Sequence, residues 1–203
     1  MSGAAVVLDR DGTLIDVVRD EETGFVGVAW HPSQVRILDG VVDGLRILSQ
    51  AGYSLAIATN QPAPAKGQFS RDAVLRTNAA LVEMLAREGV VVAHVAVCMH
   101  HPKGGPGGDA SLVGECPCRK PKPGLVVDAL AALGAAPERS WMIGDSPGDV
   151  TAGRAAGVRT GLVFDTKRCE LCPLRGGPRE APDVHAPTLL GVAERILALG
   201  AGT

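Results

Sequence analysis

Short apolar runs alternate along the chain with longer segments whose apolar residues share one helical face. The apolar runs stop abruptly at polar residues or glycine, which is typical of strands buried on both faces of a parallel sheet. They cover residues 4–8, 53–58, 90–97, 141–143 and 160–163. The segments between and after them predict helices over residues 40–50, 70–88, 123–133, 150–156 and 189–199. This alternation predicts a three-layer α/β/α, Rossmann-like fold with a mostly parallel sheet.

Local residues mark where several of these helices begin and end. Ser70 is placed to cap the helix that follows it, and Pro123 suits a first helical turn. The connection over residues 16–38 is long and polar and contains glycine and proline. We therefore expect a substrate-facing loop there and no large cap domain.

Composition and charge narrow the class of protein. The 203 residues suit one domain over residues 1–203, and 46% of them are hydrophobic and 21% charged. The net charge of −2 and the lack of a lysine or arginine run argue against nucleic-acid binding. The N-terminal apolar run is far too short for a signal peptide or a membrane span. We therefore expect a cytoplasmic protein without membrane partners, either a monomer or a weak homo-oligomer.

Two acids follow the first predicted strand. Asp9 and Asp11 stand two residues apart, so an extended chain would point both side chains the same way. Such a pair is tolerated when a cation lies between the carboxylates, and Mg²⁺ commonly takes one or two carboxylates plus a substrate phosphate. The alternative is an Asp-Gly turn with solvated acids and no chemistry. The pattern favours phosphoryl chemistry at this strand end.

Polar residues also close two later strands. Thr59, Asn60 and Gln61 follow the second strand, where hydroxyl and amide groups are suited to holding phosphate oxygens, although a polar turn before proline is the alternative. Asp145 follows the fourth strand, and carboxyl ends of parallel strands share one edge of a sheet. We therefore expect Asp145 to join Asp9 as a metal ligand, whereas Asp149 also fits a helix N-cap.

The five cysteines, an odd number in a reducing compartment, favour metal binding over disulfides. Cys98, His100, Cys116 and Cys118 form two close-spaced pairs, which predicts a closed, tetrahedral, structural zinc site in a loop over residues 98–118. His101 is an alternative ligand to His100, and unpaired core thiols are the structural alternative.

Two cations follow the last of these cysteines. Arg119 and Lys120 come directly after Cys118, so fixing the thiolate would also fix both side chains. A solvated basic turn ahead of a helix is the alternative.

These motifs together resemble those of the haloacid dehalogenase (HAD) superfamily of phosphohydrolases. The sequence D-R-D-G-T at positions 9–13 resembles its first motif, which implies that Asp9 is the nucleophile and Asp11 the general acid and base. By the same resemblance, Thr59 closes the second strand and Lys120 neutralises the aspartyl-phosphate. The G-D-x-x-x-D run at positions 144–149 implies that Asp145 binds Mg²⁺, together with Asp9 and the Asp11 carbonyl.

The Thr-Asn-Gln sequence and the zinc loop resemble a subgroup that contains heptose bisphosphate, histidinol and polynucleotide 3′-phosphatases. This resemblance implies a small phosphorylated metabolite as substrate, foremost a sugar bisphosphate. We expect substrate contacts from six residues, which are Thr13, Asn60, Gln61, Lys66, Arg119 and Ser146. Ser146 stands where many heptose phosphatases carry a basic residue, and Lys66 stands where many carry arginine. The rivals are a histidinol-phosphate or other small-metabolite phosphatase, a nucleic-acid 3′-phosphatase, which the net acidity disfavours, and a zinc-stabilised binding protein without catalysis.

A second cysteine pair lies outside this resemblance. Cys169 and Cys172 form a C-x-x-C sequence that lacks a second half elsewhere. We interpret these residues as ordinary loop cysteines, with half of an intermolecular metal site or a redox pair as alternatives.

Overall fold

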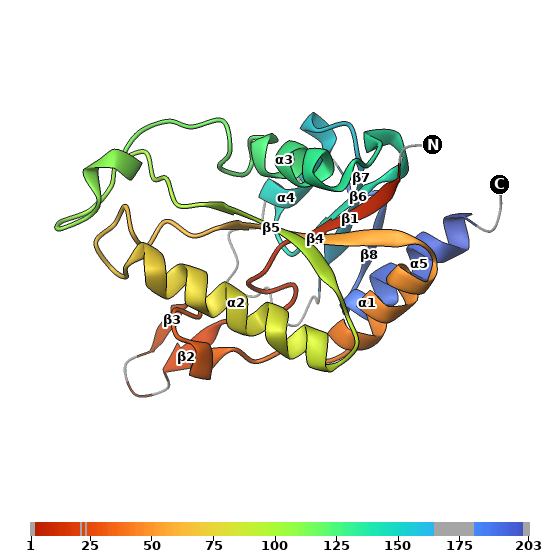
Figure 1. The fold of residues 1–203 in the computed structure, drawn as a ribbon, viewed down its shortest axis with the longest axis horizontal. Helices are drawn as coiled ribbons and strands as arrows, with labels where there is room; N and C mark the ends of the chain where they lie inside the picture. The colour runs from red at the N-terminus through yellow and green to blue at the C-terminus, as the bar shows by residue number, and fades with distance from the viewer. Residues whose placement is uncertain (1–2, 21, 23, 165–180, 201–203) are drawn as a thin grey trace.

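A parallel sheet forms the centre of the molecule in the computed structural model, which describes residues 3–20, 22, 24–164 and 181–200 (Figure 1). Its strand order is β5-β4-β1-β6-β7-β8, and every neighbouring pair is parallel. The strands are β1 (Ala4–Leu8), β4 (Tyr53–Asn60), β5 (Val92–Cys98), β6 (Trp141–Gly144), β7 (Arg159–Val163) and β8 (Val184–Ala186). Leu8 pairs with Ile57 on one side and Ile143 on the other, which brings three strand ends to one edge of the sheet.

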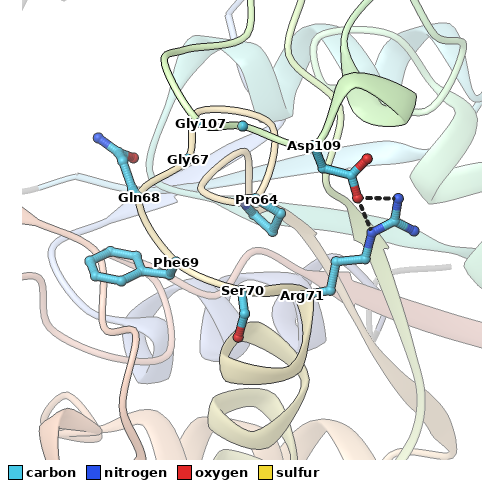
Figure 2. Close-up of a pocket in the computed structure, with 9 residues that line it drawn as sticks. Pro64, Gly67, Gln68, Phe69, Ser70, Arg71, Gly107 and Asp109 are labelled. Carbon is cyan, nitrogen blue, oxygen red and sulfur yellow. Dashed lines mark hydrogen bonds and ion pairs between the residues drawn. The ribbon is translucent and has the colours of Figure 1, made fainter.

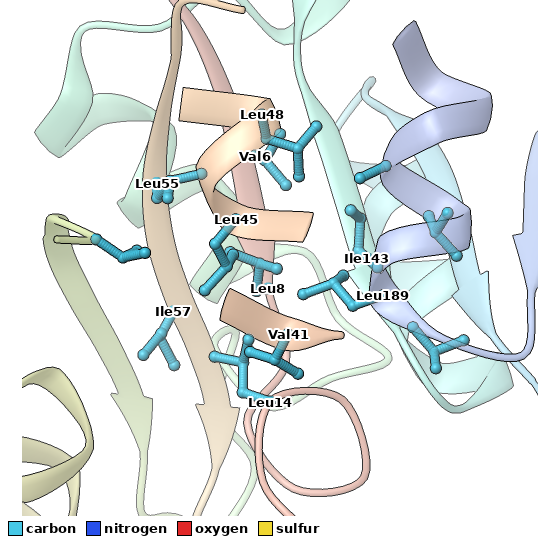
Figure 3. Packing of buried hydrophobic residues seen from close by; sticks show 14 of the residues in the cluster. Val6, Leu8, Leu14, Val41, Leu45, Leu48, Leu55, Ile57, Ile143 and Leu189 are labelled. Atoms are coloured by element: carbon cyan, nitrogen blue, oxygen red, sulfur yellow. The ribbon is translucent and has the colours of Figure 1, made fainter. Parts of the chain in front are cut away.

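Helices cover both faces of this sheet. They are α1 (Val41–Gln50), α2 (Arg71–Arg87), α3 (Gly124–Leu133), α4 (Pro147–Ala155) and α5 (Leu189–Gly200). Val6 and Leu8 point into a core with α1, α2 and α5, whereas Ala5 and Val7 point into a second core with α3 and α4. Figure 3 shows the first core, where Leu45 of α1 packs over Leu8. The predicted three-layer fold with a mostly parallel sheet is therefore confirmed.

The long connection after β1 contains more structure than its sequence predicted. It forms a short antiparallel hairpin of β2 (Val18–Asp20) and β3 (Phe25–Gly27), followed by a 3₁₀ turn at Pro32–Gln34. Strands of three residues are too short for an alternating pattern to identify them. As predicted, no cap domain is inserted here within the described residues.

Several element ends differ from the predicted ones. α2 begins as expected, because the Ser70 hydroxyl accepts a hydrogen bond from Ala73 N at 3.1 Å. α4 begins at Pro147, three residues earlier than predicted, because Ser146 and Asp149 form a capping box. β8, at Val184–Ala186, was not among the strands predicted from the sequence. Cys169 and Cys172 lie outside the described residues.

Three connections gather at the carboxyl edge of the sheet. The β2–β3 hairpin, the connection after β4 and the connection after β5 lie at the same end of the molecule (Figure 1). In the described part of the chain, no helix combines the length and the hydropathy needed to cross a bilayer.

Candidate active site and metal centre

Three carboxylates converge at the carboxyl edge of the sheet. Asp9 follows β1 and Asp145 follows the neighbouring strand β6, and one oxygen from each lies within 4.8 Å of the other and of Asp149. Burial, opposed by Lys120 and reinforced by the other two carboxylates, raises the pKa of Asp9 to about 7. Burial, with Asp149 next, raises the pKa of Asp145 to about 6. Clustered, buried carboxylates of this kind fit a divalent cation that prefers oxygen ligands.

Two glycines permit this close approach. A Cβ atom at Gly12 would collide with the carboxylate of Asp145, and one at Gly144 would collide with that of Asp149. Gly12 also has a positive φ of 80°, which other residues rarely adopt. The glycines in the two predicted motifs therefore have a direct steric reason to be there.

Lys120 joins two of the carboxylates. Its Nζ lies 2.8 Å from Asp9 Oδ1 and 2.6 Å from Asp149 Oδ1, and only 4% of the side chain is exposed. Burial alone would lower the pKa of Lys120, but the charges of Asp9 and Asp149 outweigh it and raise the pKa above its usual range. Lys120 is therefore a fixed positive charge beside the predicted nucleophile, as expected from the sequence.

Asn60 holds Lys120 and has a role that differs from the expected one. Its Nδ2 donates to Lys120 O at 3.0 Å, and its Oδ1 accepts from Lys120 N at 3.1 Å. Both polar atoms of the amide are thus paired with the main chain of Lys120. Asn60 therefore positions the lysine, and its predicted contact with substrate stays a prediction.

Asp11 and Gln61 lie beside the carboxylate cluster rather than in it. Both oxygens of Asp11 accept from the Arg10 guanidinium, at 3.0 and 3.1 Å, and one also accepts from Gln61 Nε2 at 2.6 Å. Gln61 Nε2 also donates to Thr59 Oγ1 at 2.9 Å. The Asp11 carboxylate thus faces Arg10 and Gln61 and is absent from the metal-ligand group. Gln61 is engaged with protein partners instead of facing a substrate.

The four remaining predicted substrate residues differ in their surroundings. Ser146 is the N-cap residue of α4, and its N and Oγ both donate to Asp149 Oδ2, at 3.1 and 2.5 Å, so it supports that acid. Thr13 is buried, and its hydroxyl has no partner among the described residues. Lys66 and Arg119 are half-buried on two different connections. Burial, followed by the charges of Lys66, Arg119 and Lys103, lowers the pKa of His101, so these residues form one basic cluster.

The predicted zinc ligands form a second cluster. One ligand atom from each of Cys98, His100, Cys116 and Cys118 lies within 4.8 Å of the others. Cys98 Sγ is 3.7 Å from Cys116 Sγ and 3.8 Å from His100 Nδ1. A tetrahedral zinc site with bonds of about 2.3 Å has ligand–ligand edges of about 3.7 Å, which these two distances match. Cys118 Sγ lies closer to the other two thiols, at 3.0 and 3.3 Å, and three thiols with one imidazole are a donor set that fits zinc. Burial raises the pKa of Cys98, which a bound cation would offset.

His101 lies outside this cluster. Its Nδ1 accepts from Lys103 N at 3.3 Å, and its main chain pairs with the strand-like residue Val113. Of the two histidines left open by the sequence, His100 is therefore the one that the geometry places with the thiols.

The zinc loop packs tightly against the connection after β4. A Cβ atom at Gly105 would lie 2.5 Å from Lys66 O, and one at Gly108 would collide with Ala65 O. Asp109 N also donates to Pro64 O at 3.0 Å. The glycines of the zinc loop thus let two main chains touch, and one of these carries Lys66.

A pocket of about 460 Å³ lies between these two connections (Figure 2). Arg71 at the start of α2 pairs with Asp109 across it, with Nε 2.8 Å from Oδ2. Phe69 lies at the rim and stacks on Trp30, with ring centroids 4.6 Å apart. None of the residues that line this pocket belongs to the carboxylate cluster, so the pocket is not the chemical centre of the site.

Sequence reasoning missed one charged residue of the site. Arg10 is fully buried and bonds to Asp11, to Asn78 of α2 and to the main chain of Ala29. Its position inside the D-x-D sequence was a signal, because a residue between two carboxylates at a buried strand end is placed to pair with one of them.

Comparison with known proteins identifies the family. The HAD-hydrolase-like family matches residues 117–189. The D-glycero-beta-D-manno-heptose-1,7-bisphosphate 7-phosphatase of Pasteurella multocida (strain Pm70) is 34% identical over 162 residues, which are 80% of this chain and 82% of that protein. The protein of the same name from Haemophilus influenzae is 35% identical over 163 residues, with coverage of 80% and 82%.

A solved structure shows the same architecture. The D,D-heptose 1,7-bisphosphate phosphatase from B. bronchiseptica, complexed with magnesium and phosphate, aligns with a TM-score of 0.75 and 26% identity. The alignment covers 97% of this chain and 99% of that one. The sequence identity to the relatives, the shared fold and the cluster of Asp9, Lys120 and Asp145 all indicate the same family. The chain belongs to the HAD superfamily of phosphatases, which are phosphate monoester hydrolases.

Proposed function

We propose that this chain removes the 7-phosphate from D-glycero-β-D-manno-heptose 1,7-bisphosphate through an aspartyl-phosphate on Asp9. The observation that carries the proposal is the cluster of Asp9, Lys120 and Asp145 at one sheet edge, in a chain similar to phosphatases named for this substrate. We also propose that residues 1–203 form a single HAD domain, with the zinc loop at residues 98–118.

The first half of the reaction uses Asp9 and Asp11. An Asp9 oxygen attacks phosphorus and forms a P–O bond while the bond from phosphorus to the sugar oxygen breaks. The Asp11 carboxyl gives its proton to that leaving oxygen. Lys120, 2.8 Å from Asp9, orients the nucleophile and offsets charge on the transferring group. Thr59 lies beside the same edge, where its hydroxyl supports a phosphate oxygen.

The second half releases phosphate. A water molecule attacks phosphorus while the Asp11 carboxylate accepts its proton, and the bond between phosphorus and Asp9 breaks. Bound Mg²⁺ supplies positive charge that neutralises the phosphoryl oxygens. Asp9, Asp145 and the main-chain carbonyl of Asp11 would hold this ion, with Asp149 in support, and the closeness of the three carboxylates fits that role.

The basic cluster supports a bisphosphate substrate. Lys66 lies on the connection after β4, whereas Lys103 and Arg119 lie on the connection after β5, which packs against it. The guanidinium of Arg119 is fixed by a bond to His100 O at 3.3 Å, which ties it to the zinc ligands. A second phosphate needs such fixed cations beyond the transferring group. We therefore assign Arg119 and Lys66 to the phosphate that stays on the sugar.

The proposed zinc is structural. Cys98, His100, Cys116 and Cys118 supply four protein ligands, which leaves no open position for a water nucleophile. The metal would hold the loop that carries Arg119 and Lys120.

Phosphate release from purified protein tests the proposal. We expect Mg²⁺-dependent turnover that is fastest with the heptose 1,7-bisphosphate and slower with histidinol phosphate and a 3′-phosphorylated oligonucleotide. Product analysis should show the 1-phosphate retained. Faster turnover of histidinol phosphate would replace the proposed substrate, and no turnover of any ester would favour a binding protein. The Asp9→Asn variant controls for contaminating phosphatases.

A further inference from the structure

Arg10 is a buried cation that the mechanism above does not use. Its side chain is fully buried, although it lies between the two catalytic acids in the sequence. Burying a guanidinium is costly unless its N–H groups are paired. The partners of Arg10 therefore indicate what the residue is for.

The guanidinium forms a two-bond fork with Asp11. Arg10 Nε donates to Asp11 Oδ2 at 3.1 Å, and Nη2 donates to Asp11 Oδ1 at 3.0 Å. The Asp11 side chain is 13% exposed, so its carboxylate lies at the boundary between the core and the site. A two-bond fork fixes the plane of the carboxylate as well as its position.

Two further groups hold the other side of the guanidinium. Nη1 donates to Asn78 Oδ1 at 2.6 Å, and Nη2 donates to Ala29 O at 3.0 Å. These partners come from α2 and from the connection after β3, so Arg10 is held from two sides. Together with the two bonds to Asp11, these bonds use four of the five guanidinium N–H groups of a fully buried side chain, which argues against a direct role of Arg10 in binding substrate.

Asn78 makes an unusually incomplete set of bonds for a buried amide. It is 4% exposed, and its Nδ2 has no partner among the described residues. A buried, unpaired amide nitrogen opposes stability. An apolar residue would fill the same space without burying an unpaired amide nitrogen. The bond from Arg10 to the side-chain oxygen is thus a better explanation for an asparagine here than packing.

We propose that Arg10, oriented by Asn78, is a positioning residue that aims the Asp11 carboxyl at the leaving oxygen. The inference rests on the proposed function, in which Asp11 gives a proton to the sugar oxygen as the phosphorus–oxygen bond breaks. Arg10 keeps all its protons throughout and touches neither the substrate nor the phosphate. Its effect is on the geometry of proton transfer, to which general acid catalysis is sensitive.

The leaving group gives a readout that a merely structural role would not change. A sugar alkoxide needs protonation as it leaves, whereas p-nitrophenolate leaves readily as an anion. If the Asp11 carboxyl is less well oriented, hydrolysis of a sugar phosphate should therefore slow, whereas the rate with p-nitrophenyl phosphate should hardly change. A general loss of structure would slow both reactions equally.

The main variant is Asn78→Leu, which removes the bond to Arg10 and keeps the number and branching of the side-chain heavy atoms. We expect kcat to fall about tenfold on the best sugar phosphate and less than about twofold on p-nitrophenyl phosphate, with KM unchanged. Asn78→Asp keeps an acceptor for Arg10 and should restore the sugar phosphate rate. Thr77→Val is the matched control, because its buried hydroxyl donates to Ala73 O and has no bond to Arg10.

Arg10→Lys extends the test, because it keeps the positive charge but cannot form the two-bond fork with Asp11. Its loss of kcat on the sugar phosphate, relative to p-nitrophenyl phosphate, should exceed that of Asn78→Leu. Equal losses on the two substrates in folded Asn78→Leu, or no loss on either, would overturn the inference. The sugar phosphate is whichever one the wild-type protein hydrolyses best, so a wrong substrate assignment leaves the test intact. Wild-type protein that hydrolyses neither substrate would instead overturn the proposed function, and this inference with it.

Discussion

The two ligand clusters of this molecule are built on different kinds of support. Asp9 and Asp145 follow β1 and β6, adjacent central strands in which the paired residues Leu8 and Ile143 are fully buried. Cys116 and Cys118 lie in a long connection after the edge strand β5, where Leu112 is one of few buried apolar residues. The core therefore fixes the acids without a metal, whereas we expect the loop to depend on the proposed zinc for its order.

This difference predicts separate roles for the two proposed metals. A site fixed by the core is suited to an exchangeable Mg²⁺ that takes part in each turnover, since the ligands stay in place when it leaves. A site on a loop needs a metal that remains bound, because losing it would release the loop. The link between them is Lys120, which follows Cys118 by two residues and reaches Asp9 at 2.8 Å.

Asp9→Asn tests the core-built cluster and should have the largest effect. An amide is nearly isosteric with the carboxylate but is a poor nucleophile, so we expect kcat to fall by roughly 10⁴-fold or more. The melting temperature should not fall, because the substitution removes a charge from a crowded group of acids. Steady-state phosphate release and thermal unfolding check both points. Turnover near the wild-type rate would contradict the aspartyl-phosphate mechanism.

Cys118→Ser tests the loop-built cluster. Loss of one thiolate should release the zinc and displace both Arg119 and Lys120, so kcat should fall and KM should rise, by roughly 10²-fold in kcat/KM. The loop should loosen without unfolding the sheet, which predicts a loss of about 2 kcal/mol, or roughly 4–8 °C in melting temperature. Metal analysis should find about one zinc per wild-type chain and none in the variant.

Cys98 is buried at the end of β5 and offers a comparison within the same cluster. Cys98→Ser should also lose zinc. Full activity and an unchanged melting temperature in zinc-free protein would show that the thiols only pack together and that the loop does not need the metal.

The same contrast explains what the sequence could and could not predict. Asp9 and Asp145 were predicted because an apolar run that ends in an acid fixes where the acid lies in a parallel sheet. The zinc ligands were predicted because the spacing of such ligands is itself informative. Neither signal depends on the detailed path of the chain. The fold itself was predicted from the alternation of apolar runs and helical segments, and it is confirmed.

Side-chain direction was less predictable. Asn60 and Gln61 stand at a strand end, as expected, but their amides bond to Lys120 and Asp11. A polar residue beside a site has the same sequence pattern whether it faces the substrate or supports a neighbour. Arg10 was missed for the opposite reason, because an arginine next to acids resembles a surface residue until α2 and Ala29 are seen to cover it.

Arg119→Ala tests the role of Arg119 separately from that of Lys120, the other cation that follows the zinc loop. It should have a smaller effect than Asp9→Asn and Cys118→Ser. If Arg119 binds the phosphate that stays on the sugar, its loss should raise KM for the bisphosphate about tenfold and leave kcat nearly unchanged. A monophosphate substrate should be affected little. Lys120→Ala is the comparison variant, because it should lower kcat on both substrates. An unchanged preference between bisphosphate and monophosphate in Arg119→Ala would remove the assigned role.

The smallest expected effect concerns how pH and Mg²⁺ act on the core-built cluster. Burial raises the pKa of Asp9 from 3.8 to about 7 and that of Asp145 to about 6. In metal-free protein the folded state therefore binds these protons more tightly than the unfolded chain, so this contribution to stability is present at low pH and is lost as pH rises from about 4 to about 7. Mg²⁺ binds the ionised carboxylates, so it should raise the melting temperature by roughly 2–4 °C at about pH 8 and by less at about pH 5. Differential scanning fluorimetry with and without MgCl₂ measures this difference, and Asp145→Asn should reduce it because one ligand is lost. An equal Mg²⁺ shift at both pH values, or an undiminished one in Asp145→Asn, would show that the ion binds elsewhere and that the carboxylates are not its site.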